Sequence, residues 1–221
     1  MIKNVQVKSS ETVALSPPEG SAKDRPGYVI HELFFCNTSA EKTEIIKDSS
    51  ERFGPNKSGH QVHAHGGLSL TKDHYKFGSS SLFFNSSEHY ATVNQSLDWN
   101  FGGEEFTVEF WIKFTKEIPS DATQTNGRIP ILCSKSWEIY HGVSGAGITA
   151  AFKKNSERIY LESSRKLDNG EWYHVAVSRT IRNELVLYVN GIRDAIIHNF
   201  GGALDDSNDV LYIGQDKDRF Q

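Results

Sequence analysis

A disulfide framework, a membrane-spanning apolar run and a basic excess are all missing from this chain of 221 residues. Its two cysteines are too few for such a framework, and both Cys36 and Cys133 lie in apolar segments, which favours buried free thiols over the alternative of a single bridge. No apolar run approaches the roughly 18 residues of a spanning helix. A net charge of −4 gives no indication of the basic surface that nucleic-acid binding requires.

Catalytic and targeting signatures are also missing. No G-x-S-x-G elbow, Walker loop, H-E-x-x-H or C-x-x-C string occurs. Residues 1–8 lack the apolar centre of a signal peptide, which indicates a protein that is made and kept in a cytoplasm, or one that leaves it by lysis or a non-standard route. With 37% hydrophobic and 11% aromatic residues, the composition is typical of a globular protein. We therefore expect a folded protein without enzymatic activity.

Residues 106–114 show the most regular alternation in the chain. Phe106, Phe110 and Phe114 share one parity with a valine and an isoleucine, whereas polar residues and Trp111 hold the other parity. Successive side chains of a strand point to opposite faces, so this segment predicts a strand with one apolar and one mixed face. The segment favours an all-β protein.

Strand-like runs recur along the rest of the chain with turn residues between them. They occupy Gln61–His65, Ser81–Phe84, Tyr90–Val93, Phe106–Phe114, Arg128–Ser134, Trp137–Tyr140, Ile148–Phe152, Arg158–Glu162, Trp172–Arg179, Glu184–Val189, Ile192–Ile197 and Val210–Ile213, with earlier runs at Val5–Val7 and Tyr28–Cys36. Asn190-Gly191 between two runs predicts a type I′ hairpin, because both residues tolerate positive φ. This spacing is typical of a β-sandwich or barrel.

Several segments, in order and spacing, resemble patterns of laminin-G-like domains. They are Phe77–Phe84 with Tyr90–Val93, Glu105–Trp111, Glu171–Arg179, Leu187–Gly191, Leu211–Gly214, and the loop Asp48–Ser50 followed by His60. The resemblance covers residues 28–214. It implies a two-sheet antiparallel jelly-roll sandwich of the concanavalin A-like kind, in its laminin-G-like or pentraxin-like branch. We expect an N-terminal arm at residues 1–27 and the jelly-roll domain at residues 28–221.

The chain departs from the family pattern after Gly214. Family members continue into one more strand, which usually supplies an acidic metal ligand, and no matching segment follows here. Either the sequence is a fragment, or the missing strand comes from the N-terminal arm or from a neighbouring chain, because an unpaired sheet edge invites pairing.

Glu109 and Trp111 form the candidate ligand site. They lie two residues apart on one strand face, and a tryptophan beside a carboxylate can stack on a sugar ring and bond its hydroxyls. The alternative is that a loop covers Trp111, which then serves packing. Carboxylates with glycosidase spacing are not evident, and the E-x-D-x-x-E strand of jelly-roll glucanases does not occur.

Two clusters are candidates for metal binding. The oxygen-rich residues that suit calcium are Asp205, Asp206, Asn208, Asp209, Asp48 and Asn37, with Asp216 and Asp218 as a further acidic segment. Solvated acidic turns are the alternative. His60, His63 and His65 carry imidazoles that suit zinc, but no third rigid ligand is evident beside the strand pair, so exposed strand histidines are the favoured interpretation.

The resemblance implies a non-enzymatic binding or assembly module. Standalone domains of this branch are familiar among phage and virus structural proteins, so we expect a virion surface protein, either a capsid decoration or a tail-associated adhesin. Its partners would be other virion proteins or itself through residues 1–27, and a host surface glycan. A calcium-dependent carbohydrate-binding lectin, found extracellularly, is the first alternative, and a glycan-cleaving enzyme is the second.

Overall fold

The computed structural model describes residues 5–6, 46, 60–78, 80–115, 128–142, 147–168, 170–205 and 209–216. Within them the chain is all-β apart from a single 3₁₀ turn at Leu97–Trp99. The strands are β1 (Val5–Gln6), β2 (Val62–His65), β3 (Ser69–Thr71), β4 (Ser81–Phe83), β5 (Tyr90–Val93), β6 (Phe106–Lys113), β7 (Arg128–Cys133), β8 (Trp137–Gly142), β9 (Ile148–Lys154), β10 (Glu157–Glu162), β11 (Trp172–Arg179), β12 (Leu185–Val189), β13 (Ile192–Ile197) and β14 (Leu211–Ile213).

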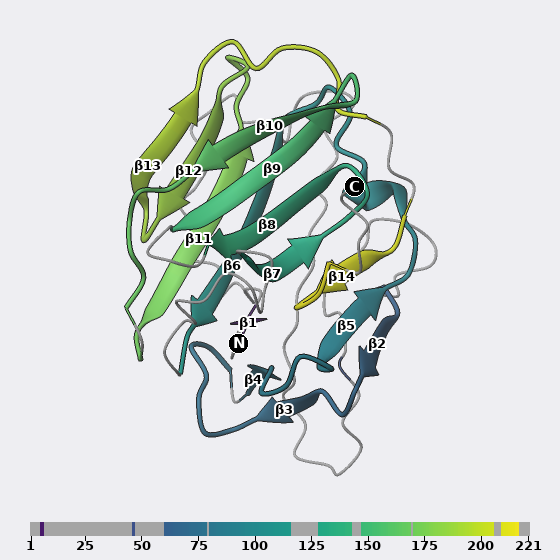
Figure 1. Ribbon diagram of the computed structural model, residues 1–221, viewed down its shortest axis with the longest axis vertical. Helices are drawn as coiled ribbons and strands as arrows, with labels where there is room; N and C mark the ends of the chain where they lie inside the picture. Colours follow the sequence, from purple (N-terminus) through teal and green to yellow (C-terminus); the bar gives the residue numbers. More distant parts are fainter. Residues whose placement is uncertain are drawn as a thin grey trace, which may run out of the picture.

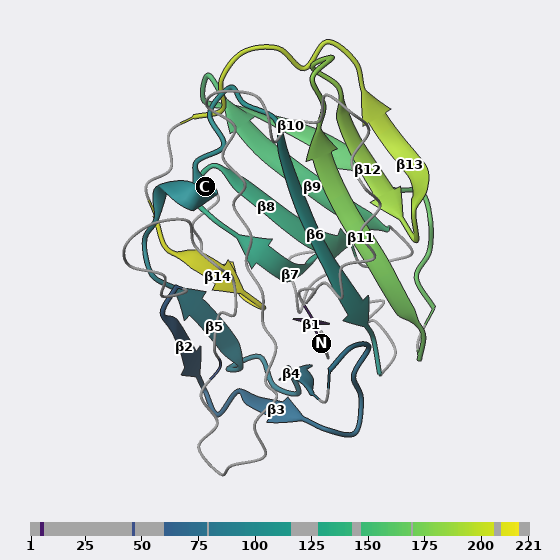
Figure 2. The ribbon, with the colours of Figure 1, turned by 180° about the vertical axis from the view of Figure 1, so that it is seen from behind.

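The strands form two antiparallel sheets of seven strands each. Sheet 1 has the order β13-β12-β11-β6-β1-β4-β3, and sheet 2 has the order β10-β9-β8-β7-β14-β5-β2. In Figure 1 the long strands β7 to β10 lie in front of β6 and β11, and Figure 2 shows the same layers from behind. This arrangement confirms the predicted two-sheet antiparallel sandwich.

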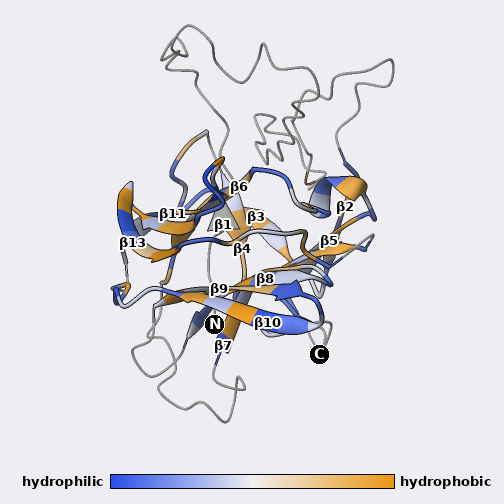
Figure 3. Ribbon diagram, turned by 90° about the horizontal axis from the view of Figure 1, so that it is seen from above, coloured by the Kyte–Doolittle hydropathy of each residue, from blue (hydrophilic) through white to orange (hydrophobic). Residues whose placement is uncertain are grey.

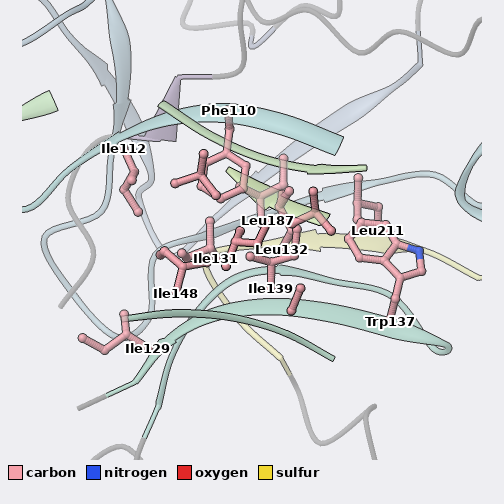
Figure 4. Packing of buried hydrophobic residues seen from close by; sticks show 14 of the residues in the cluster. Phe110, Ile112, Ile129, Ile131, Leu132, Trp137, Ile139, Ile148, Leu187 and Leu211 are labelled. Carbon is pink, nitrogen blue, oxygen red and sulfur yellow. The ribbon is translucent and has the colours of Figure 1, made fainter. Parts of the chain in front are cut away.

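Alternation along the strands fills the space between the sheets. Phe110, Ile112 and Phe114 are fully buried, as the pattern of residues 106–114 predicts. They face Ile139 and Ile148 from sheet 2 within one apolar cluster, which Figure 4 shows from close by. Seen edge-on in Figure 3, β6 and β11 lie in one layer and β8 to β10 in the other. Burial of this apolar surface is the main stabilising contribution to the fold.

The predicted hairpin between β12 and β13 is confirmed. Asn190 has φ 52° and Gly191 has φ 74°, the left-handed values that a type I′ turn requires. The Asn190 side chain also accepts a hydrogen bond from the backbone N–H of His174 at 2.8 Å, which joins the turn to β11. The turn therefore fixes the register of three neighbouring strands.

Strand β1 lies inside sheet 1, between β4 and β6. Val5 pairs with Leu82 on one side and with Ile112 on the other, and Gln6 pairs with Trp111. The short strand expected near Val5–Val7 is therefore present, and a segment from the arm supplies a strand to the sandwich. The boundary between arm and domain stays a prediction, and the run Tyr28–Cys36 lies outside the described residues.

The strand predictions agree with the structure to within two residues at each end, with one omission. Strand β3, with the sequence Ser-Leu-Thr, pairs with β4 but is too short to show an alternating pattern. Across the described ranges, no helix has the length and hydropathy needed to span a membrane. The Cys133 side chain is buried, as expected, and its Sγ lies 3.6 Å from the Ser134 carbonyl oxygen, whereas Cys36 lies outside those ranges.

Candidate functional site

Glu109 and Trp111 lie together on the outer face of sheet 1. Their neighbours in β6, Phe110 and Ile112, point into the core, so the two candidate residues point away from it. Cross-strand pairing puts His174 of β11 directly opposite Trp111. The predicted common face is therefore confirmed, and sugar binding there stays a prediction.

The indole ring of Trp111 is covered by neighbouring side chains. The Lys76 ammonium lies 4.4 Å from the ring centroid, and Phe77 meets the ring edge-on with centroids 5.6 Å apart. His174 packs against it at 5.2 Å. A sugar could stack on this ring only after Lys76 moved away. The geometry thus favours the packing role for Trp111.

Glu109 makes a second contact with His174. The imidazole Nε2 lies 3.1 Å from the Glu109 carboxylate, whose side chain is 40% exposed. This exposed carboxylate remains accessible to a ligand at the edge of the covered tryptophan. Because a pair this exposed is well screened by solvent, it contributes little to stability.

The outer face of sheet 2 offers a more open aromatic surface. Tyr160 of β10 is 44% exposed, and Tyr140 of β8 is half-buried. Between them β9 contributes only Thr149 and Ala151, which pair with Tyr140 and Tyr160 respectively. Small residues between two tyrosines leave their rings standing above the sheet. We name this surface, defined by Tyr140, Thr149, Ala151 and Tyr160, the tyrosine face.

The hydroxyl group of Tyr140 lies in a polar neighbourhood. Burial raises the pKa of Tyr140, a side-chain hydrogen bond with Thr149 opposes the shift, and the nearby Glu138 and Tyr160 raise the pKa further. On β10, Arg158 and Glu162 share the outward parity of Tyr160 and are exposed. The tyrosine face therefore combines two aromatic rings with a donor and an acceptor at opposite ends.

An ion-pair network lies beside the tyrosine face. Arg128 of β7 donates from Nη1 to Glu138 at 2.6 Å and from Nη2 to Asp216 at 2.8 Å. The same guanidinium lies 5.7 Å from the ring centroid of Tyr140. Arg128 thus joins β8, the segment after β14 and the aromatic surface, and holds Tyr140 in position.

The pKa of Glu138 is strongly raised by its surroundings. It points outward from β8, yet its side chain is only 2% exposed. Burial raises the pKa of Glu138 from 4.5 to about 7, Arg128 opposes this shift, and the negative charge of Asp216 adds to it. The carboxyl group is therefore partly protonated near neutral pH.

The histidine cluster does not converge on one point. His60 bonds Asp98 at 2.6 Å, His63 bonds Asn94 at 3.1 Å, and His65 bonds Thr92 at 2.9 Å. Each imidazole thus has its own partner. His63 is exposed on β2, as the favoured interpretation expects, whereas His60 precedes the strand and its side chain is only 7% exposed. Among the described residues, no group of three or more histidine, cysteine, aspartate or glutamate side chains is arranged to hold a metal.

Only some of the calcium candidates lie among the described residues. Asp205 accepts a hydrogen bond from the backbone N–H of Ser156 at 3.0 Å, which caps the turn between β9 and β10. Asp209 accepts one from the N–H of Val210 at 2.8 Å. The remaining candidates lie outside the described residues; they are Asn37, Asp48, Asp206 and Asn208. Calcium binding by this set stays a prediction.

The tyrosine face was not among the sites that the sequence predicted, although its signal is visible. Trp137–Gly142 alternates apolar residues with Glu138 and Tyr140, and the β10 segment alternates Ile159 and Leu161 with Tyr160. These patterns predict which side chains share a face of one strand. They do not predict that β8 and β10 lie in the same sheet two positions apart, which only the topology shows.

Taken together, the strand order and the shared core define a two-sheet jelly-roll sandwich. The chain belongs to the concanavalin A-like lectin/glucanase superfamily, whose sequence model matches residues 85–221. This confirms the resemblance at the level of the superfamily. No curated protein sequence matches the chain.

Solved structures of binding domains share this fold. The binding domain of Paraclostridial Mosquitocidal Protein 1 is similar with a TM-score of 0.61 at 16% identity, over 82% of this chain and 44% of that one. The botulinum neurotoxin serotype D ligand binding domain, solved with N-acetylneuraminic acid, gives 0.53 at 19% identity, over 71% and 38%. This chain therefore spans less than half of each toxin domain.

A domain from an enzyme is also similar. Domain 4 of AbnA, a GH43 extracellular arabinanase from Geobacillus stearothermophilus, solved in complex with arabinotriose, gives a TM-score of 0.52 at 14% identity, over 72% of this chain and 74% of that one. At these identities the comparisons support the jelly-roll fold alone, so function has to be argued from the site.

Proposed function

We propose that this protein is a non-enzymatic glycan-binding module whose contact surface is the tyrosine face. The observation that carries the proposal is the exposed ring of Tyr160 beside Tyr140, with the charged Arg158 and Glu162 on the same strand face. Sugars bind by stacking their C–H faces on aromatic rings while hydroxyl groups bond to side chains at the rim. The sugar complexes of two structural neighbours support this class of ligand.

Tyr160→Ala should weaken glycan binding about tenfold or more, because it removes the most exposed ring of the tyrosine face. The measurement is binding to an oligosaccharide panel that includes arabinotriose and a sialylated trisaccharide, followed by titration of the best ligand. Tyr75→Ala is the matched control, since Tyr75 is 49% exposed but lies between β3 and β4. Equal losses in both variants, or no binding anywhere on the panel, would contradict the proposal.

The face that carries Glu109 and Trp111 is the second candidate surface. Glu109→Gln removes its accessible carboxylate and leaves the tyrosine face intact. A loss of binding in Glu109→Gln but not in Tyr160→Ala would move the site to sheet 1. Hydrolysis of a β-glucan that disappears in Glu109→Gln would replace the binding module by the alternative of a glycan-cleaving enzyme.

The biological setting that we propose is a virion surface, where the protein is a capsid decoration or a tail-associated adhesin. The support is the resemblance of the sequence to laminin-G-like domains, standalone forms of which are familiar among phage and virus structural proteins. Mass spectrometry of particles purified on a density gradient would detect the chain at stoichiometric amounts. Its absence from such particles would favour the extracellular lectin instead.

The calcium-dependent lectin remains the alternative for the same fold. Its ligands would come from the acidic loop that contains Asp205 and Asp209. A bound ion stabilises the native state by mass action, so calcium should raise Tm and chelation should lower it. An unchanged Tm in both directions contradicts the calcium site and leaves the tyrosine face untouched.

A further inference from the structure

The histidine-bearing edge of sheet 2 carries an aromatic surface of its own. In β5 the side chains of Ala91 and Val93 are fully buried, so Tyr90, which has the opposite parity, points outward. His65 of β2 is the cross-strand partner of Tyr90, and the two rings stack with centroids 4.3 Å apart and 11° between their planes. Both residues are half-buried. A pair of stacked rings therefore lies on the outer face of this edge.

A chain of exposed polar side chains lies beside these rings. The Asn94 side chain donates from Nδ2 to Gln61 Oε1 at 2.9 Å, and its Oδ1 lies 3.1 Å from His63 Nε2. All three residues are exposed. An amide has two N–H donors and two acceptor positions, so these bonds leave capacity for the hydroxyl groups of a ligand. Aromatic rings beside amide and imidazole groups suit a sugar, which has apolar C–H faces and a hydroxyl rim.

This edge and the tyrosine face lie on the same side of sheet 2 and at about the same level. Leu132 of β7 pairs with the residue before Tyr140 and with Ile213 of β14. Ile213 in turn pairs with the residue after Tyr90. Because neighbouring strands are antiparallel, both tyrosines are displaced from this line in the same direction. The strand order β8-β7-β14-β5, which Figure 1 also shows, separates them by three strand spacings, or about 14 Å.

The two strands between these tyrosines carry a polar group that can bridge them. Arg128 of β7 and Asp216, which follows β14, form an ion pair at 2.8 Å, and their side chains are 24% and 23% exposed. Their charges neutralise each other, so an uncharged chain rich in hydroxyl groups can cross the pair and bond to either side chain. The outer face of sheet 2 thus has aromatic rings at two places and polar groups between them.

We infer that Gln61, His63, His65, Tyr90 and Asn94 form a second sugar subsite, and that one linear, uncharged oligosaccharide occupies this subsite together with the tyrosine face. The inference rests on the proposed function, since it extends the tyrosine face. A ligand that already contacts the tyrosine face reaches the second subsite without a further loss of translational freedom, so a longer chain gains affinity. The substrate class is therefore an extended glycan and not a single terminal sugar.

The experiment is calorimetric titration of the full chain with short and long linear glycans. The probes are arabinotriose and arabinohexaose, with cellotriose and cellohexaose as a second pair. For the pair that binds, we expect the hexasaccharide to have a Kd at least about tenfold below that of the trisaccharide. A single short site would give a gain of about fourfold at most, because its only advantage is that the longer chain can occupy it in several registers.

Two variants test the second subsite separately from the tyrosine face. Tyr90→Ala and His63→Ala should each remove most of the gain with chain length and leave the trisaccharide affinity unchanged, whereas Tyr160→Ala should weaken both chain lengths. His63 is exposed, so His63→Ala keeps the test decisive if Tyr90→Ala does not fold. His198→Ala is the matched control, because His198 is also exposed and hydrogen-bonded but follows β13 of sheet 1. It should change neither affinity.

The outcomes separate this inference from the proposed function. A gain with chain length that survives in both Tyr90→Ala and His63→Ala would overturn the second subsite, and so would a gain in the native protein no greater than the register effect. In either case a loss of trisaccharide binding in Tyr160→Ala would still support the tyrosine face. Absence of binding by both pairs of probes would contradict the tyrosine face and the second subsite together.

Discussion

His141→Leu should remove a contribution of about 3 kcal/mol by which His141 lowers the free energy of unfolding between pH 6.5 and pH 4. His141 points inward from β8 and is 2% exposed. It packs edge-on against Phe114, with ring centroids 5.0 Å apart. Neither ring nitrogen has a hydrogen-bond partner that meets normal geometry. The core therefore holds a neutral imidazole and disfavours an imidazolium.

The direction of the pH effect follows from the pKa of His141 in the folded and in the unfolded chain. Burial, the largest cause, lowers the pKa of His141 from 6.5 to about 4, and the nearby Gly142 backbone opposes the shift. Between these pH values the unfolded chain binds a proton that the folded chain excludes. The contribution of His141 to the free energy of unfolding therefore falls as the pH decreases through this window, and leucine removes that contribution.

Urea denaturation at intervals from pH 4 to pH 8 measures the effect. Ile148→Val is the matched control, because Ile148 is the cross-strand partner of His141 and does not titrate. It should lower stability by about 1 kcal/mol equally at every pH. If His141→Leu and the control give parallel curves, His141 is not the buried base described here.

Glu138→Gln is expected to have an effect of similar size and opposite sign. Burial raises the pKa of Glu138 from 4.5 to about 7 against the opposing charge of Arg128, while Asp216 raises it and Arg158 lowers it. Between these pH values the folded chain keeps a proton that the unfolded chain releases. Relative to Glu138→Gln, the native protein should thus lose at most about 3 kcal/mol of stability as the pH rises from 4.5 to 7.

Glutamine keeps an oxygen that can accept the hydrogen bond from Arg128, so the comparison isolates the ionisable proton. The same urea series measures it, with Thr149→Val as a non-titrating control on the same face of sheet 2. A curve for Glu138→Gln that runs parallel to that of the native protein would show that Glu138 ionises as freely in the folded as in the unfolded chain.

The pH effects of Glu138 and His141 on stability should partly cancel in the native protein. Their windows overlap between pH 4.5 and pH 6.5, where Glu138 lowers stability with rising pH and His141 raises it. The summed contribution of these two residues to the free energy of unfolding should therefore change little with pH in this range. Each single variant exposes the slope of the other, and the double variant should be flat again because the sites lie on opposite faces of β8.

The local patterns of the sequence predicted most of the strands and their faces. Phe110 and Ile112 are buried as the alternation requires, and Asn190-Gly191 forms the expected turn, because both features depend only on near neighbours in the chain. The contacts of Trp111 depend on Lys76 and Phe77 from a distant loop. The alternating pattern of β6 cannot predict contacts with another segment, so the sequence analysis chose as a ligand site a tryptophan ring that other side chains cover.

Long-range pairing likewise decided the features that the sequence left open. Glu138 stands alone in its segment, and its acidic partner Asp216 comes from beyond β14, with Arg128 joining them. The expectation of a strand supplied by the arm or by a neighbouring chain left open where that strand would sit. The register of β1 places it between β4 and β6, which no single segment specifies.

The position of β1 between β4 and β6 has a consequence during biosynthesis. Val5 and Gln6 leave the ribosome well before Ile112 and Trp111, their partners in β6, have been translated. At the usual rates of elongation this interval is roughly 5 to 20 s. Late in this interval β4 can already pair with one edge of β1, but the edge that β6 covers in the finished protein stays open. Neighbouring ribosomes on one messenger carry the same segment, so translation on polysomes brings unfinished copies together while at least one edge of each β1 is unpaired.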